Sequence, residues 1–178
     1  MKILYFPQTK PFWCGPAAVQ MLLAYYGIHQ AQGELAQVLK TTLKEGTTLS
    51  NIQNYLQTLA FQSHYKIFEN QELALSSLKA RIENESPVIT LLNRLIYDQE
   101  TSLMNESVDW ESDTFSNHFV VVNAVNEHQI FFKDPHKLMG AMSLPIETFL
   151  EAWFSAKGPG EMLWVLPSKN WIKKSLDK

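Results

Sequence analysis

The sequence Phe12-Trp13-Cys14-Gly15-Pro16-Ala17-Ala18 contains the single cysteine of this 178-residue chain. Pro16 suits the first turn of a helix, where the N–H that proline lacks has no partner in any case. Gly27 suits the C-terminal end of such a helix, because glycine tolerates the left-handed conformation often found there. Between them the apolar residues fall on one helical face: Ala17, Ala18, Met21, Leu22 and Tyr25. The stretch therefore predicts a helix over residues 14–27 that begins at Cys14.

A cysteine in the first turn of a helix is well placed for nucleophilic chemistry. The partial positive charge at the helix N-terminus favours the thiolate over the thiol. Gly15, the next residue, lets the backbone approach a substrate closely. The alternative is that Cys14 is a small buried apolar side chain, as free cysteines often are. Taken by itself, this stretch fits the second interpretation better.

The composition favours one globular domain whose core rests on packing alone. Hydrophobic residues make up 46% of the chain, with 10 Phe, 6 Tyr and 5 Trp, which is enough apolar material for one core. A single cysteine excludes an internal disulfide, which suits a reducing compartment. The formal net charge of −3 provides no basic excess, so we expect no nucleic-acid-binding surface.

The N-terminus does not resemble a secretory signal. Its apolar run, residues 3–6, ends at Pro7 and is shorter than the roughly 7–15 apolar residues of a signal peptide. No apolar stretch approaches the roughly 20 residues that span a bilayer. We therefore expect a cytoplasmic protein without a membrane span, and secretion without a cleaved signal stays open.

The order of the predicted elements favours an α+β fold, with helices first and a mainly antiparallel sheet after them. Besides 14–27, helices are predicted over 32–40, from Ser50 to about residue 59, over 71–84 and over 145–154. Strands are predicted over 87–92, 118–125, 129–134 and 161–166, after a short β-prone run at 3–6. We expect one domain over residues 1–168 and a basic tail over 169–178.

His118 and Asp134 are brought together by the predicted hairpin over residues 118–134. His118 opens the first strand, next to a loop, where a base can face a cleft. A hairpin about Glu127 puts Asp134 nearly opposite, with side chains about 5 Å apart. A carboxylate there can hold the imidazole and fix its tautomer. The alternatives are a structural histidine and an Asp-Pro pair that merely ends a strand.

Two further polar residues lie near these positions in the sequence. Gln8 is six residues before Cys14, and its amide can donate to a developing oxyanion beside the N–H of Cys14. The alternative for Gln8 is a solvated loop residue. His136 follows Asp134-Pro135 and is expected near the edge of the site.

The ordered set of these residues resembles the double-glycine-leader peptidases, the bacteriocin-processing cysteine peptidases of the papain-like superfamily. The family pattern has a Gln six residues before the Cys, a Cys-Gly pair that opens a long helix, a His-Phe-Val-Val strand and an Asp-Pro pair after the next strand. This chain carries all four in order: Gln8, residues 14–18, residues 118–121 and residues 134–135.

The resemblance implies a papain-like peptidase fold, in which a helical part with the cysteine at a helix N-terminus packs on an antiparallel sheet. It implies that Cys14 is the nucleophile and that His118 takes the thiol proton and later protonates the leaving amine. It also implies that Asp134 orients His118 and that Gln8 helps to form the oxyanion hole. A bacterial enzyme with a peptide or protein substrate, and with neither cofactor nor metal, follows from the same resemblance.

The chain departs from the family in two ways. Transporters of the family carry membrane-spanning and ATP-binding domains after the peptidase, and this sequence contains neither, so we do not expect processing coupled to export in one chain. The acidic segment 93–117 is longer than the family needs and lies directly before His118. It either covers the cleft or forms a solvated loop, and Trp110 and Phe115 within it argue for docking.

Several activities are compatible with this set of residues. The leading hypothesis is hydrolysis of peptide or isopeptide bonds through a thioester acyl-enzyme. Acyl transfer, transpeptidation and deamidation use the same chemistry, and a catalytically silent peptide-binding module would keep the fold without turnover. A metal site on Cys14, His118 and Asp134 is a further alternative, which no CxxC or HxxxH pair supports. Substrate, cleavage site and oligomeric state stay open.

Overall fold

The computed structural model describes residues 1–59, 61–101, 116–136 and 140–167. The expected basic tail, 169–178, and most of the acidic segment 93–117 lie outside the described residues. The described elements, in chain order, are α1 (Cys14–Tyr25), α2 (Gln32–Val38), α3 (Leu49–Thr58), β1 (Phe61–Ile67), α4 (Gln71–Glu83), β2 (Val88–Asn93), α5 (Arg94–Thr101), β3 (Asn117–Val125), β4 (Gln129–Lys133), β5 (Ala141–Pro145), α6 (Ile146–Phe154) and β6 (Glu161–Pro167).

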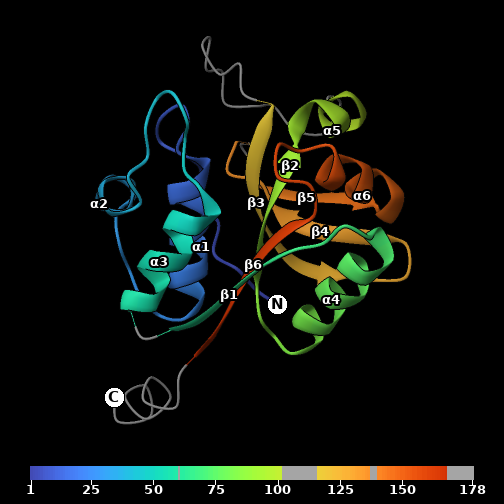
Figure 1. Cartoon of the computed structure of the whole chain (residues 1–178), viewed down its shortest axis with the longest axis horizontal. Helices are drawn as coiled ribbons and strands as arrows, with labels where there is room; N and C mark the ends of the chain where they lie inside the picture. Colours follow the sequence, from blue (N-terminus) through green and yellow to red (C-terminus); the bar gives the residue numbers. More distant parts are fainter. Residues whose placement is uncertain (60, 102–115, 137–139, 168–178) are drawn as a thin grey trace.

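The described strands form one antiparallel sheet in the order β1-β6-β2-β3-β4-β5. The strand that comes last along the described chain, β6, is therefore inserted between β1 and β2. Figure 1 shows α1, α2 and α3 on one side of this sheet and α4, α5 and α6 on the other. The predicted α+β class is confirmed.

Each face of the sheet carries its own apolar core. One core lies under α1 and α3 and includes the fully buried Met21 and Ile52. The other lies under α4 and α6 and includes the fully buried Phe149 and Trp153. Alternate residues of β2 and β3 belong to the two cores, because successive side chains of a strand point to opposite faces. This explains why both strands are nearly continuous apolar runs in the sequence.

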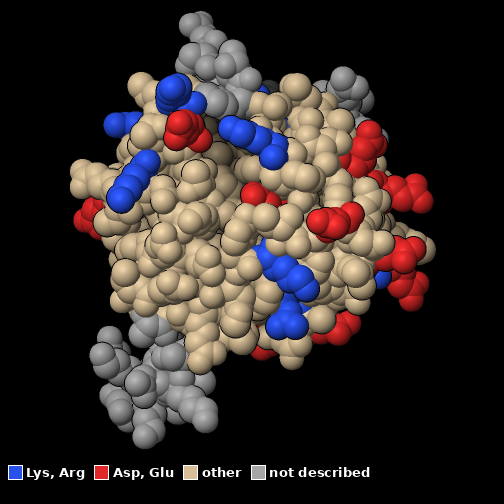
Figure 2. Space-filling model, viewed as in Figure 1, with Lys and Arg blue, Asp and Glu red and all other residues tan. Residues whose placement is uncertain are grey.

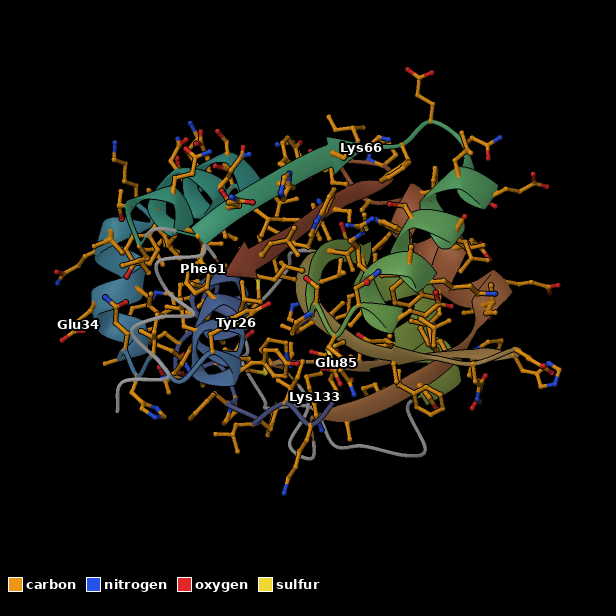
Figure 3. All side chains as sticks on the ribbon, turned by 90° about the horizontal axis from the view of Figure 1, so that it is seen from below. Tyr26, Glu34, Phe61, Lys66, Glu85 and Lys133 are labelled. Atoms are coloured by element: carbon orange, nitrogen blue, oxygen red, sulfur yellow. The ribbon has the colours of Figure 1, made fainter. Side chains whose placement is uncertain are left out.

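Tyr26, which follows the C-terminal end of α1, attaches the helix to β1 and β6 at one edge of the sheet. Its ring centroid lies 5.1 Å from that of Phe61 in β1, and its hydroxyl donates to the carbonyl oxygen of Val165 in β6 at 3.2 Å. Figure 3 shows Tyr26 and Phe61 next to each other. Burial raises the pKa of Tyr26 to about 12, so the hydroxyl stays protonated as a donor. The helix that begins at Cys14 is thus anchored at its other end as well.

Charged side chains are distributed over the surface without a continuous patch of one sign on the face shown in Figure 2. On that face, acidic side chains are most frequent along the side that carries α4 and α6. Among the described helices, none is both long enough and apolar enough to cross a bilayer.

The five predicted helices are confirmed, with ends that shift by a few residues: they correspond to α1, α2, α3, α4 and α6. At α3, Thr48 and not Ser50 is the N-cap. The Thr48 hydroxyl accepts a hydrogen bond from the backbone N–H of Asn51 at 3.1 Å. Thr48 lies two residues before Ser50, and threonine is also a favoured N-cap residue.

The prediction that helices come first and the sheet after them is wrong, because β1 lies between α3 and α4. The edge strands β1 and β5 and the short helix α5 were missed, and the β-prone run at 3–6 forms no strand. Edge strands keep few apolar residues: β5 buries only Met142 and Leu144, and β1 alternates with the polar Gln62, His64 and Lys66. Such a pattern is weak in a single sequence.

The predicted hairpin is confirmed, and it contains a β-bulge between Val122 and Ala124. Val121 pairs with Lys133, so the register continued by one residue puts Asp134 beside residue 120 and not beside His118. His118 is therefore a diagonal neighbour of Asp134. Diagonal pairs are about 7–8 Å apart at the backbone, which long side chains can still bridge.

We expect Gly160→Ala to destabilise the fold more than Gly27→Ala. Both glycines have φ near +70°, at +68° and +76°, where alanine costs about 1–2 kcal/mol. A Cβ at Gly160 would also lie 2.2 Å from the carbonyl oxygen of Phe68, whereas a Cβ at Gly27 meets nothing within 4 Å. The clash should add about 1–3 kcal/mol to the loss at Gly160.

Urea denaturation of the two variants measures this difference in the free energy of unfolding. Equal losses would mean that the close approach of Gly160 to Phe68, between β6 and the end of β1, does not constrain the fold.

Candidate active site

Cys14 is the first residue of α1 and is half-buried at the mouth of a cleft. α1 packs on β3, the strand that carries His118. The chain enters the helix through Phe12, which has a φ of +65° and also lines the cleft. A left-handed conformation is uncommon for a bulky residue and tends to occur at functional sites. No pattern in the sequence indicated this turn.

His118 and Asp134 form a buried pair directly behind the cysteine. His118 Nε2 and Asp134 Oδ1 are 2.5 Å apart, and the two side chains are 3% and 0% exposed. The backbone N–H of His136 donates to the same carboxylate oxygen at 2.8 Å. His118 lines the cleft, whereas Asp134 does not. Asp134 therefore contacts the imidazole from the protein interior, and only His118 of the two borders the cleft.

The protonation of this pair is set by burial and by charge. Burial alone lowers the pKa of His118, but the charge of Asp134, its hydrogen bond and the neighbouring Cys14 sulfur together raise that pKa above its usual 6.5. Burial alone raises the pKa of Asp134, but His118 and the His136 N–H together lower it below its usual 3.8. Both shifts favour an imidazolium beside a carboxylate.

Gln8 is buried and connects the segment before α1 to the loop after β4. Its backbone N–H donates to the carbonyl oxygen of Pro135 at 2.9 Å, and its side-chain Nε2 donates to the carbonyl oxygen of Lys10 at 3.3 Å. Gln8 lines the same cleft as Cys14 and His118. An amide nitrogen carries two hydrogens, so one N–H remains for a ligand in the cleft.

Gly15 serves a purpose that differs from the expected one. A Cβ at this position would lie 2.5 Å from the Cβ of Thr47, so the glycine admits the loop that contains Thr47 and not a substrate. The hydroxyls of Thr47 and Thr41 are 2.7 Å apart, and Thr42 and Gly46 form an isolated β-bridge. This short, internally bonded loop makes one wall of the cleft.

The cleft has a volume of about 560 Å³ and combines apolar and charged walls. Its remaining walls come from strands and turns that lie far from Cys14 in the sequence. The residues around it are Gln8, Phe12, Cys14, Lys44, Glu45, Gly46, Thr47, Thr48, Leu49, Ser50, Tyr65, Leu91, Asn117, His118, Phe119, Lys157, Gly158 and Glu161.

His136 lies next to the site, as expected, and it is buried. It is 5% exposed, and its ring packs edge-on against that of His118 with centroids 5.9 Å apart. Tyr65 and Glu161, on two neighbouring strands, were not predicted as site residues at all. Only the fold brings them to the cleft, because 96 residues separate them in the sequence.

Among the described residues, no group of three or more His, Cys, Asp and Glu side chains is arranged to hold a metal ion. The four predicted site residues are nevertheless close to one another: Gln8, Cys14 and His118 line one cleft, and Asp134 contacts His118.

A helix that begins at a cysteine and packs against a histidine-bearing strand of an antiparallel sheet defines a papain-like cysteine peptidase fold. The Peptidase_C39 like family matches residues 1–160, and the chain belongs to this family. It is a cysteine peptidase-like enzyme. A curated relative is the lactococcin-A transport/processing ATP-binding protein LcnC of Lactococcus lactis subsp. lactis, 24% identical over 149 residues. That match covers 84% of this chain but only 17% of the relative.

Solved structures share the fold at low sequence identity. A C39-like peptidase from Bacillus anthracis has a TM-score of 0.69 and 17% identity, with 94% of this chain and 96% of that chain covered. The peptidase domain of Streptococcus ComA has a TM-score of 0.65 and 19% identity, with 94% and 98% covered. A double glycine motif protease from an AMS/PCAT transporter, solved with a leader peptide, has a TM-score of 0.66 and 20% identity, with 94% and 93% covered.

We expect Asp134→Asn to destabilise the protein most between about pH 4 and pH 6.5. A raised pKa at His118 contributes stability that is complete below 6.5 and is lost as the pH rises through the raised value. A lowered pKa at Asp134 contributes stability that is complete above 3.8 and is lost as the pH falls through the lowered value. Within this window the variant should lose on the order of 3 kcal/mol.

The free energy of unfolding in urea, measured from about pH 4 to pH 9, tests this expectation. Glu127→Gln is the matched control, because Glu127 is exposed in the hairpin turn and the same charge is removed there. A loss at Asp134→Asn that is the same at every pH would contradict the assigned charge state.

Proposed function

We propose that the protein hydrolyses peptide or isopeptide bonds, with Cys14 as the nucleophile, His118 as the proton carrier and Asp134 as the residue that orients His118. The observation that supports this most directly is the buried pair of His118 and Asp134, 2.5 Å apart, beside the sulfur of Cys14. A carboxylate on Nε2 leaves Nδ1 of the ring as the nitrogen for the thiol. That is the arrangement a thiolate–imidazolium pair needs.

The reaction then follows from the positions of these groups. The Cys14 thiolate attacks the carbonyl carbon, and the charge moves to the carbonyl oxygen, where the N–H of Cys14 and the amide of Gln8 can donate. His118 gives its proton to the leaving amine as the C–N bond breaks, which leaves a thioester on Cys14. Water attacks the thioester, gives one proton to His118 and releases the acid product and the thiolate.

The substrate class that we propose is a peptide or protein. The cleft is lined by the apolar Leu91 and Phe119 together with polar and charged residues from several elements, which suits a peptide with mixed side chains. A structural neighbour, the double glycine motif protease, was solved in complex with a leader peptide. Acyl transfer, transpeptidation and deamidation share the thioester, and they differ from hydrolysis only in the acceptor or in the bond that is cut.

We expect His118→Ala to slow alkylation of Cys14 by iodoacetamide about tenfold or more near pH 6. His118 is the base proposed to take the proton of the thiol, so without its ring the sulfur should react more slowly with the reagent. The alkylation rate is measured across pH. His128→Ala, at the exposed hairpin turn, should keep the profile of the unchanged protein. If His118→Ala also keeps that profile, the pair is not functional.

We expect Cys14→Ala and His118→Ala each to lower peptide hydrolysis by at least about 1,000-fold, since nucleophile and base act as one unit. Mass spectrometry of a peptide library, with and without an added primary amine, measures this loss and identifies the acceptor. Amide products that appear only with the amine would indicate acyl transfer. A cleft that binds peptides with no turnover in the unchanged protein would identify a silent binding module.

A further inference from the structure

One carboxylate in the cleft is held far more rigidly than the other charges there. The Tyr65 hydroxyl donates to Oε1 of Glu161 at 2.6 Å. The carboxylate lies against Gly158, because a Cβ on that glycine would be 2.2 Å from Oε2. The backbone carbonyl of Glu161 accepts from the indole N–H of the buried Trp153 at 2.8 Å. Glu161 is thus fixed at its backbone and at its side chain.

This carboxylate has no cationic partner among the residues that the structure describes. Its one hydrogen bond is to Tyr65 on Oε1, so Oε2 is available to a ligand in the cleft. Besides Cys14 and His118, the other ionisable residues with acidic or basic side chains that line the cleft are Lys44, Glu45 and Lys157, and all three are exposed. Exposed charges are mobile and strongly screened by salt, whereas a half-buried, fixed carboxylate is screened less.

The hydroxyl of Tyr65 strengthens this arrangement. Burial raises its pKa, and the hydrogen bond and the charge of Glu161 raise it further, so the hydroxyl stays protonated and serves only as a donor to Oε1. The carboxylate is therefore oriented before a substrate arrives. An oriented group loses little entropy when a ligand binds to it.

The strand register gives the backbone separation between Glu161 and the strand that carries His118. The printed pairing of β2 with β6 ends at Thr90 and Met162, and the next position of this register joins Leu91 to Glu161. Leu91 also pairs with Phe119, which is next to His118. Neighbouring strands are about 4.8 Å apart, so this row spans about 10 Å. Leu91 and Phe119 also line the cleft and form an apolar floor along it. An extended peptide covers 10 Å with about three residues.

We propose that Glu161 and Tyr65 form a subsite that selects a lysine or arginine about three residues from the bond that is cut. The stem of such a side chain would lie on the apolar floor, and its cation would meet Oε2 of Glu161. This proposal rests on the proposed function and specifies its substrate class as peptides with a basic residue near the cleavage point.

The test compares matched peptides that carry lysine or the uncharged norleucine at each position within four residues of the cleaved bond. In the unchanged protein we expect kcat/KM to be about tenfold higher with lysine at one of these positions. Glu161→Gln should bring this ratio close to one. Gly158→Ala should reduce it as well, because the new methyl group displaces the carboxylate and leaves its charge in place.

Glu69→Gln is the matched control, since Glu69 is exposed after β1 and does not line the cleft. It should keep the ratio of the unchanged protein, and added salt should lower the ratio in both. A ratio near one at every position of the unchanged protein would overturn the proposal. So would a ratio that stays high in Glu161→Gln, because the carboxylate would then serve only to join β1 and β6.

Binding separates failure of this proposal from failure of the proposed function. Fluorescence anisotropy of the same labelled peptides with Cys14→Ala reports the lysine preference without turnover. If peptides are cleaved with no lysine preference, only the subsite is wrong. If nothing is cleaved, the proposed function is wrong, and the binding ratio still decides whether Glu161 selects a cation.

Discussion

The contact between His118 and Asp134 is the constraint on which the arrangement of the site depends. Because His118 and Asp134 are almost fully buried and water does not solvate their charges, each must be paired with the opposite charge of the other. Asp134 is the residue directly after β4, and His118 is the second residue of β3, so the hairpin between these strands has to keep its register. The bulge after Val122 is part of that register.

The contacts around His118 and Asp134 also fix the position of α1 and of the segment that leads into it. The N–H of Gln8 is bonded to Pro135, which follows Asp134, and so the segment that leads into α1 is attached to the same loop. α1 begins six residues later at Cys14 and packs on β3. At its far end, Tyr26 binds to β1 and β6. The helix α1 therefore connects β3, which carries His118, to β1 and β6 at one edge of the sheet.

The sequence predicted the parts of this structure that rest on local patterns. The helix at Cys14 and the hairpin of β3 and β4 have strong periodicity and clear end signals, and the helix, its cysteine and the two strands are where they were expected. The edge strands were missed because β5 buries two residues and β1 carries polar residues at alternate positions. Two contacts at the cleft depend on packing between segments that are apart in the sequence, so a periodic pattern of apolar residues cannot predict them. They join Tyr65 to Glu161 and Gly15 to Thr47. Asp134 lies beside residue 120 and reaches His118 diagonally, so the predicted pair was two residues out of register although the contact itself was anticipated.

The insertion of β6 between β1 and β2 has a consequence for biogenesis. A ribosome makes β1 long before its neighbour in the sheet, so β1 has no strand to pair with until β6 has been synthesised. Glu161 and the turn at Gly158 arrive with β6, and they supply one wall of the cleft. Pairing across such a long sequence separation is slow and comes late in folding. A nascent chain that already carries Cys14, His118 and Asp134 thus lacks the wall that Glu161 and Gly158 supply, and the cleft is completed only after β6 has been made.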